Sequence, residues 1–322
     1  MNFLDVTGEF LGKIDFAKSK IVQPQRLVFV CGGQNSGDPK SPTSMREILL
    51  SRASSTGKAG YIGPARVILA EAAVNFLSRS SFSNLLDLER FIAAAVHAVI
   101  LIVESPGSMC ELGAFVMAPE IREKLIVVMQ SDHIPRSSFI TNGAIQYFED
   151  NEKDAQVLGY QWSIDKNTRK ISIADFAIDA MVKEVPEAMD RVHRVHARET
   201  FKKELDGHLI YLTLAFCHML RAAKQSEIKR CFEFSSIEIS EQKLKHCLDI
   251  LQISDLVKCI RHGKLDYYAP LVEELPVHFS FHSGTEKRDR STSRWITRIA
   301  AEISSDPDEQ FRIEMFKGRK NG

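Results

Sequence analysis

The chain has 322 residues, 44% of them hydrophobic and 26% charged, which is typical of a globular protein long enough for two domains. No apolar run reaches the roughly 18 residues that cross a bilayer, and the opening MNFLDVTGEFLGK lacks a signal-peptide pattern. We therefore expect a cytoplasmic protein with no membrane partner. Six scattered cysteines without a CxxC pair argue against a disulfide framework and against a zinc site.

The formal net charge of zero is unevenly divided along the chain. Residues 191–322 hold 23 Lys and Arg against 19 Asp and Glu, a net charge of +4, which leaves 19 basic and 23 acidic residues, or −4, for the remainder. This asymmetry permits nucleic acid binding by the C-terminal part without requiring it.

The first part of the chain has the pattern of strands alternating with helices. Apolar runs that do not alternate with polar residues predict buried strands, and helical spacing predicts the helices between them. Gly63 and Pro64 suit the start of a helix that contains Val67 and Leu77, and a later helix should end at Pro186. Strands are expected at 26–33, 99–103 and 124–129, a short one at 59–63, and helices at 44–53, 64–77, 85–98, 108–117 and 172–185. The pattern predicts a doubly wound α/β domain with a parallel sheet over residues 1–190.

After Pro186 the alternation does not return. The polar stretch 189–205 predicts a linker or a connecting helix, and helices are expected near 205–222, 226–232 and 240–251. Two short strands should follow around a turn at His262, Gly263 and Lys264. Three helices and a hairpin are the order of a winged helix-turn-helix, so we predict a second, smaller winged-helix domain over residues 196–322, with a basic C-terminal segment.

A candidate site lies where two of the predicted strands end. In a parallel sheet, ligands bind beyond the carboxyl ends of the strands, in loops that lead into helices. Glycine lets the backbone approach a ligand, and free N–H groups at a helix start can hold a phosphate or a sugar oxygen. The residues of these loops that we expect to bind substrate are Gly32, Gly33, Ser105, Gly107 and Ser108.

Glu111 has two interpretations on spacing alone. Ser108 and Glu111 form the S-x-x-E pattern of a capping box, in which the glutamate only satisfies the helix start. Alternatively, an ionised carboxylate there can attack or stabilise the anomeric carbon of a sugar. The local pattern cannot separate the two.

The string ESPGSMCELGAF, with LLDLERFIAAAVHAVILIV before it and SFITNG (138–143) after it, closely resembles effector proteins encoded beside retron reverse transcriptases. These effectors have a nucleoside deoxyribosyltransferase-like domain followed by a winged-helix domain. The resemblance covers residues 26–148 by motif and the rest by element order. It implies that Glu111 is the nucleophile and that Glu89 binds ribose hydroxyls or assists departure of the base, with Asp87 a weaker candidate. It also implies that Phe139 and Asn142 contact the base or sugar, although the chain lacks the proline that related effectors carry after SFITNG.

The resemblance further implies a toxic N-glycosidase or (deoxy)ribosyltransferase-like enzyme that cleaves a nucleotide or NAD. Its expected partners are the retron reverse transcriptase and its msDNA, the RNA-linked single-stranded DNA, which would restrain it until phage infection. We expect an oligomer, because such active sites are often completed by a neighbouring subunit. No cofactor or metal is expected, since nothing completes a metal site around His193 and His196. The alternatives are a non-catalytic nucleotide-binding sensor and a DNA-binding regulator.

Overall fold

The computed structural model describes residues 2–34, 42–53, 60–133, 138–165, 170–196 and 198–318. It divides into two compact units, and neither is one continuous stretch of chain. Unit 1 comprises Met1–Pro24, Phe76–Asn84 and Arg198–Gly322, and unit 2 comprises Gln25–Asn75 and Leu85–Ala197. The N-terminal 24 residues thus lie in unit 1, whereas the predicted 1–190 boundary placed them with the sheet.

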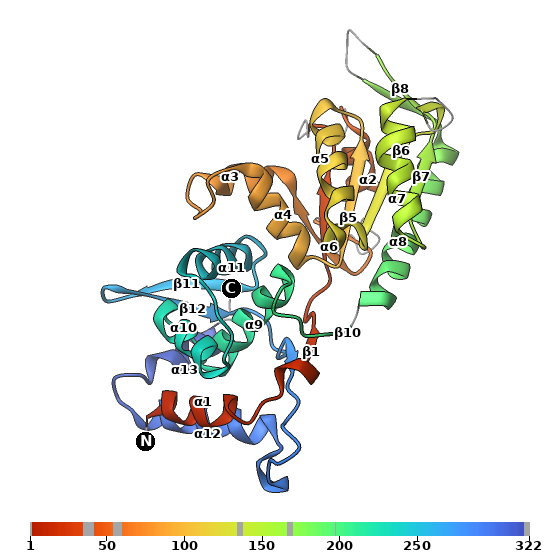
Figure 1. Cartoon of the computed structure of the whole chain (residues 1–322). Helices are drawn as coiled ribbons and strands as arrows, with labels where there is room; N and C mark the ends of the chain where they lie inside the picture. Colours follow the sequence, from red (N-terminus) through yellow and green to blue (C-terminus); the bar gives the residue numbers. More distant parts are fainter. Residues whose placement is uncertain are drawn as a thin grey trace. The chain divides into compact units, whose positions relative to one another are not determined.

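Unit 2 is built on a six-stranded sheet in the order β3-β4-β2-β5-β6-β7, in which only β3 runs antiparallel (Figure 1). Its strands are β2 (Leu27–Cys31), β3 (Tyr61–Ile62), β4 (Ala65–Leu69), β5 (Ala98–Val103), β6 (Leu125–Gln130) and β7 (Gln156–Tyr160). The parallel strands have the order 2-1-3-4-5 of a doubly wound sheet, which confirms the predicted α/β class. A separate hairpin pairs β8 (Trp162–Ile164) with β9 (Ile171–Ile173).

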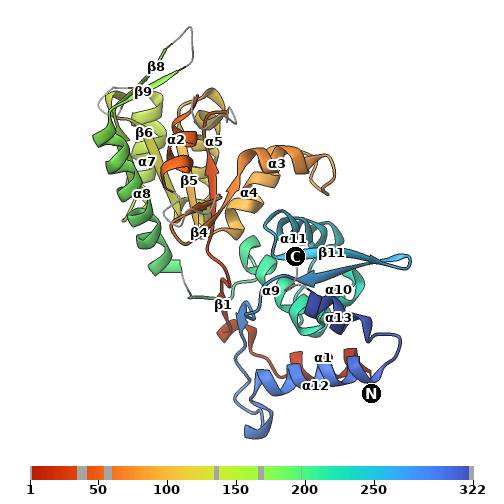
Figure 2. The same cartoon turned by 180° about the vertical axis from the view of Figure 1, so that it is seen from behind.

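Helices cover both faces of this sheet (Figures 1 and 2). Apolar residues of α2 (Met45–Arg52) and α8 (Asp175–His196) pack on one face, against strands that include β2, β5 and β6. The remaining helices of the unit are α3 (Ala70–Leu77, whose last two residues fall in unit 1), α4 (Leu85–Ala95), α5 (Pro106–Met117), α6 (Pro119–Arg122) and α7 (Gln146–Asn151), with short turns η2 (Ser131–His133) and η3 (Ile140–Ile145, a π-helix). The Lys124 ammonium donates to the carbonyls of Ala94 (2.7 Å) and Val96 (2.9 Å) at the end of α4. This contact satisfies carbonyls that a helix end leaves unpaired.

Two predicted helices differ from the structure. The segment after Pro64 is strand β4 up to Leu69, and the helix begins only at Ala70. Because β4 and α3 join without a loop, the helical spacing of apolar residues in α3 led to the wrong prediction that the helix also includes the residues of β4. The other helix, α8, does not end at Pro186 but continues to His196. Val185, Ala188 and Met189 are buried in the core around that proline, and their packing offsets the hydrogen bond that the proline removes.

Unit 1 contains the predicted three helices and hairpin. These are α9 (Asp206–Met219), α10 (Gln225–Phe234) and α11 (Glu241–Ile253), followed by β11 (Val257–His262) paired antiparallel with β12 (Leu265–Pro270). Gly263 occupies the hairpin turn at φ 61°, which favours glycine. An isolated bridge joins Ala223 to Tyr268 of β12, between the first two helices and the hairpin.

The rest of unit 1 brings the two ends of the chain together. Helix α1 (Phe3–Leu11) lies beside α12 (Thr292–Ser305), and Phe10 stacks on the buried Trp295 at 5.9 Å between ring centroids (Figures 1 and 2). A second sheet has the order β10-β1-β13, and Arg312 is fully buried beside Glu227, with Nη2 2.7 Å from Oε1. The remaining elements are β1 (Lys20–Val22), β10 (Arg198–Thr200), β13 (Val277–His278), α13 (Phe311–Gly318), η1 (Phe16–Lys18) and η4 (Lys287–Asp289).

Candidate active site at the carboxyl edge of the sheet

The site lies at the carboxyl ends of the adjacent strands β2 and β5. These are the first and third parallel strands along the chain. The strand that follows β2 in the chain is added on one side of β2, and the strand that follows β5 is added on the opposite side of β5. Doubly wound sheets bind ligands at such a switch in direction. The predicted loops after Cys31 and Val103 meet at this edge.

The start of α5 is closed by two serines rather than by Glu111. Ser105 is the N-cap, its hydroxyl oxygen accepts from the Ser108 N–H (3.2 Å), and the Ser108 hydroxyl oxygen accepts from the Ser105 N–H (3.0 Å). The helix begins at Pro106, three residues before the start that the Ser108–Glu111 pattern indicated. The capping interpretation of Glu111 is therefore wrong: this glutamate lies on the second turn. The hydroxyls of Ser105 and Ser108 hold the loop together at the edge of the site.

Glu104 ties the two loops of the site to each other. Its carboxylate accepts from the backbone N–H groups of Gly33 (2.8 Å), Met45 (2.7 Å) and Arg46 (3.3 Å). Burial raises the pKa of Glu104, and these three donors act against that shift. A Cβ on Gly33 would lie 3.0 Å from the Glu104 carboxyl, and one on Gly32 3.1 Å from Oε1. The glycine pair therefore makes room for this carboxylate, whatever else it binds.

Glu89 of α4 and Glu111 of α5 lie close enough for the charge of one to act on the other. Glu89 is only 4% exposed, and burial together with the negative charge of Glu111 raises its pKa to about 8. Burial also raises the pKa of Glu111, but the nearby Arg46 guanidinium acts in the opposite direction. The surroundings therefore favour a protonated Glu89 at neutral pH. A protonated carboxyl group beside an ionised one can act as acid and nucleophile.

Arg46 and Glu71 complete this cluster, and neither was among the site residues predicted from the sequence. Arg46, on the first turn of α2, is 1% exposed and forms an ion pair with Glu71, which follows β4 at the start of α3. Both charges act on Glu111. A buried arginine needs a paired carboxylate, but neither residue belongs to a motif, and the helix wrongly predicted from Pro64 concealed that Glu71 follows the end of a strand.

Cys31, the last residue of β2, lies near the cluster, since the charges of Glu111 and Glu89 act on it. It is fully buried, and burial, followed by these charges, raises the pKa of its thiol well above the usual range. A thiol in these surroundings is a poor nucleophile.

Other predicted residues lie apart from this cluster or on its margin. Asp87 is exposed on α4, so Glu89 is the buried acid of that helix. Asn142 lies exposed in the π-helix η3, and the neighbouring Phe139 is 90% exposed. A Cβ on Gly107 would meet only Ser105 Oγ, at 3.8 Å, so space beside the loop is open. Substrate binding by Asn142 and Gly107 stays a prediction.

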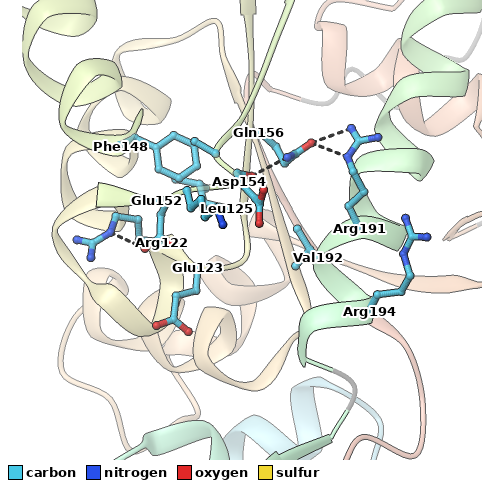
Figure 3. A pocket seen from close by; sticks show the side chains of 12 residues that line it. Arg122, Glu123, Leu125, Phe148, Glu152, Asp154, Gln156, Arg191, Val192 and Arg194 are labelled. Carbon is cyan, nitrogen blue, oxygen red and sulfur yellow. Dashed lines mark hydrogen bonds and ion pairs between the residues drawn. The ribbon is translucent and has the colours of Figure 1, made fainter. Parts of the chain in front are cut away.

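A cavity of about 480 Å³ opens at the opposite edge of the sheet, around the amino ends of β6 and β7 (Figure 3). Two of its guanidinium groups are already engaged: Arg122 Nε contacts Glu152 at 2.9 Å, and Arg191 donates twice to Gln156 Oε1 (3.0 and 2.7 Å). Figure 3 shows Arg122 pointing away from Arg191 rather than toward a common point. Its volume alone does not make this cavity the better site, because these two arginines do not converge.

The ranges that the structure describes contain neither a metal cluster nor a membrane-spanning helix. Within the described residues, no three His, Cys, Asp or Glu side chains are placed to share a metal ion. No helix in the same ranges is long and apolar enough to cross a bilayer.

The chain matches the model of a known protein family. The model of the family described as "STM3845 retron effector protein" matches residues 42–259, which is more than half of the chain and includes all four clustered side chains. The chain belongs to this retron effector family. The family match confirms the predicted association with retrons.

Two relatives from Escherichia coli bear related names. The chain is 29% identical over 197 residues to the "Retron Ec73 putative ribosyltransferase/DNA-binding protein", covering 59% of each chain. It is 43% identical over 63 residues to the "Retron Ec86 putative ribosyltransferase/DNA-binding protein", covering 20% of each. Since the alignments span 59% and 20% of these relatives, the names alone do not transfer an activity to the chain.

Proposed function

We propose that the chain is a toxic effector that cleaves the N-glycosidic bond of a nucleotide or of NAD, with Glu111 as the nucleophile and Glu89 as the acid. The observation that carries the proposal is the buried Glu89 beside Glu111 at the carboxyl edge of the sheet, where burial and the charge of Glu111 raise the pKa of Glu89. The retron family and the ribosyltransferase names of two relatives support it.

In the first step, a Glu111 carboxylate oxygen forms a bond to C1′ while the C1′–N bond breaks and its electron pair leaves with the base. A neutral purine or pyrimidine takes a proton from Glu89 as it departs, whereas nicotinamide leaves NAD as a neutral molecule without one. Water then attacks C1′ and releases Glu111. The proton that the attacking water loses passes to Glu89 if Glu89 has given its own proton to the base, and otherwise to solvent.

The test uses pure full-length protein incubated with NAD and with nucleoside 5′-monophosphates, alone and with the retron reverse transcriptase and its msDNA. Free base is measured by mass spectrometry. We expect Glu111→Gln to lower base release by on the order of 10³-fold or more, because it removes the attacking charge. Asp87→Asn, an exposed carboxylate on the helix of Glu89, is the matched control and should retain activity.

Full activity of Glu111→Gln would reject the nucleophile. No base release by the wild type under any of these conditions would favour the nucleotide-sensor alternative. If Glu111→Gln leaves toxicity in cells intact, the regulator alternative gains instead.

We also propose that unit 1 is a winged-helix domain that docks the msDNA or the reverse transcriptase. Three helices, the bridge of Ala223 to β12 and the hairpin occur in the order of that fold. Lys245 on α11 and Lys258 and Lys264 on the hairpin are exposed, as phosphate contacts require. The oligomeric state and cytoplasmic location stay predictions.

A further inference from the structure

Three polar atoms at the candidate site are buried without a hydrogen-bond partner in the described part of the chain: Arg46 Nε, Glu71 Oε2 and Glu111 Oε2. Although 42% of the Glu71 side chain is exposed, this one oxygen is not. Arg46 is bonded to Glu71 through Nη2, so its Nε–H is a second donor that the ion pair does not use. A buried polar atom without a hydrogen bond destabilises the site, so a group that contacts these atoms is favoured.

The kind of group follows from the atoms. One is a donor and two are carboxylate oxygens that accept, and a hydroxyl can accept from the guanidinium and donate to a carboxylate at once. A phosphate has no such fit, since it would bring negative charge against Glu71 and Glu111. An apolar base edge would satisfy none of the three.

The position of the hydroxyl follows from the reaction, and here the inference rests on the proposed function. The two oxygens of one carboxylate lie side by side, so when one attacks C1′ the other lies near the substituent on the next carbon. On a ribose that substituent is the 2′-hydroxyl, whose hydrogen bonds to enzyme strengthen as C1′ gains positive charge.

We propose that Arg46 and Glu71 hold the 2′-hydroxyl of the substrate sugar beside Glu111, so that the site selects ribosides over 2′-deoxyribosides. Arg46 and Glu71 are binding residues in this scheme. Their charges also act on Glu111, whose pKa Arg46 lowers and Glu71 raises.

The experiment compares matched pairs that differ only at C2′. These are each nucleoside 5′-monophosphate with its 2′-deoxy form, and NAD with its analogue that lacks the 2′-hydroxyl on the nicotinamide ribose. Wild-type protein should prefer the riboside in kcat/KM by on the order of 10²-fold or more, because the deoxy form leaves buried polar atoms unpaired. Glu71→Gln and Arg46→Lys should lower kcat/KM on the riboside by roughly 10-fold more than on the deoxyriboside, whereas a merely structural role would lower both equally.

A binding measurement separates this inference from the proposed function. Calorimetric titration of wild type and Glu71→Gln with ribose 5-phosphate and 2-deoxyribose 5-phosphate requires no catalysis. Melting curves check the fold of both variants. If the buried Arg46→Lys does not fold, Glu71→Gln still decides, because its side chain is partly exposed.

The outcomes are distinct. Equal cleavage of ribosides and deoxyribosides, or equal losses on both in the variants, overturns the inference while the glycosidase function stands. No cleavage, with a ribose preference in binding that Glu71→Gln abolishes, overturns the function and retains the subsite. Absence of both cleavage and binding preference overturns the two together.

Discussion

Glu89 is a carboxyl group whose surroundings favour the protonated form at neutral pH, because it is buried and Glu111 lies beside it. Burial raises the pKa of both glutamates, and the two differ in their charged neighbours. The charge of Glu111 adds to the rise for Glu89, whereas for Glu111 the Arg46 guanidinium acts against the rise and Glu71 adds to it. Charged neighbours thereby make two residues of the same type unequal.

The pKa of Glu89 predicts a pH dependence that differs between substrates. Cleavage of nucleosides with a neutral base should fall as pH rises through about 8, because the acid loses its proton. Cleavage of NAD should not fall there, since nicotinamide needs no proton. Rate profiles from pH 6 to 10 on both substrates check this, and a shared decline at about 8 would contradict the assigned role.

The same group links stability to pH. Unfolded Glu89 titrates near 4.5 and folded Glu89 near 8, so between these values the folded state binds the extra proton. The free energy of unfolding should therefore decrease as pH rises through this window, by on the order of a few kcal/mol. Glu89→Gln should remove this part of the slope in melting temperature, while the shift of Glu111 in the same direction leaves a residual slope. Identical slopes in both proteins would rule out the shifted group.

At the level of elements, the site depends on how loops are fixed at the ends of strands. The motif around Glu111 was sufficient to predict its position, but not the helix start, since ESPGSMCE contains both a Ser105–Ser108 and a Ser108–Glu111 pair at capping spacing. Pro106, suited to a first helical position, favours the earlier start that the structure has. Arg46 and Glu71 could not be predicted, because their pairing arises from three-dimensional packing between α2 and the segment after β4.

Gly33→Ala should disrupt the hydrogen bonds by which the Glu104 carboxylate joins the two loops of the site. The new Cβ would lie 3.0 Å from the Glu104 carboxyl and from Ser44 Cβ, so the loop must move, and overpacking of this kind costs about 1–3 kcal/mol. We expect a lower melting temperature together with reduced activity, since Glu104 also holds the start of α2 that carries Arg46.

Gly113→Ala is the matched control. It lies in α5, where a Cβ would meet nothing within 4 Å, and alanine should stabilise the helix by roughly 0.5–1 kcal/mol. Equal melting temperatures for the two alanine variants would contradict the steric role of Gly33.

At the scale of the whole molecule, the proposed nucleic acid contacts lie in unit 1, far along the chain from the glutamates. The double variant Lys258→Glu with Lys264→Glu should weaken msDNA binding by roughly 10-fold or more at low salt and flatten the salt dependence, because two phosphate contacts are lost. The purified protein's activity on small substrates should not change.

Lys202→Glu with Lys203→Glu makes the same charge change at exposed positions before α9 and serves as control. Fluorescence anisotropy at several salt concentrations measures both. Equal weakening by the two pairs would indicate a general charge effect and not a docking surface.

The chain passes between its two units at Pro24–Gln25, Asn75–Phe76, Asn84–Leu85 and Ala197–Arg198. A gene cut near residue 190 would therefore not release an intact unit: α1 would lose α12, and β1 would lose both neighbouring strands. Phe10 and Ile21, buried in the whole protein, would then face water. Because neither unit is one continuous segment of the gene, recombination cannot exchange it in one piece, and we expect the two units to be inherited together. Point substitutions are therefore better suited than truncations to dissect the proposed function.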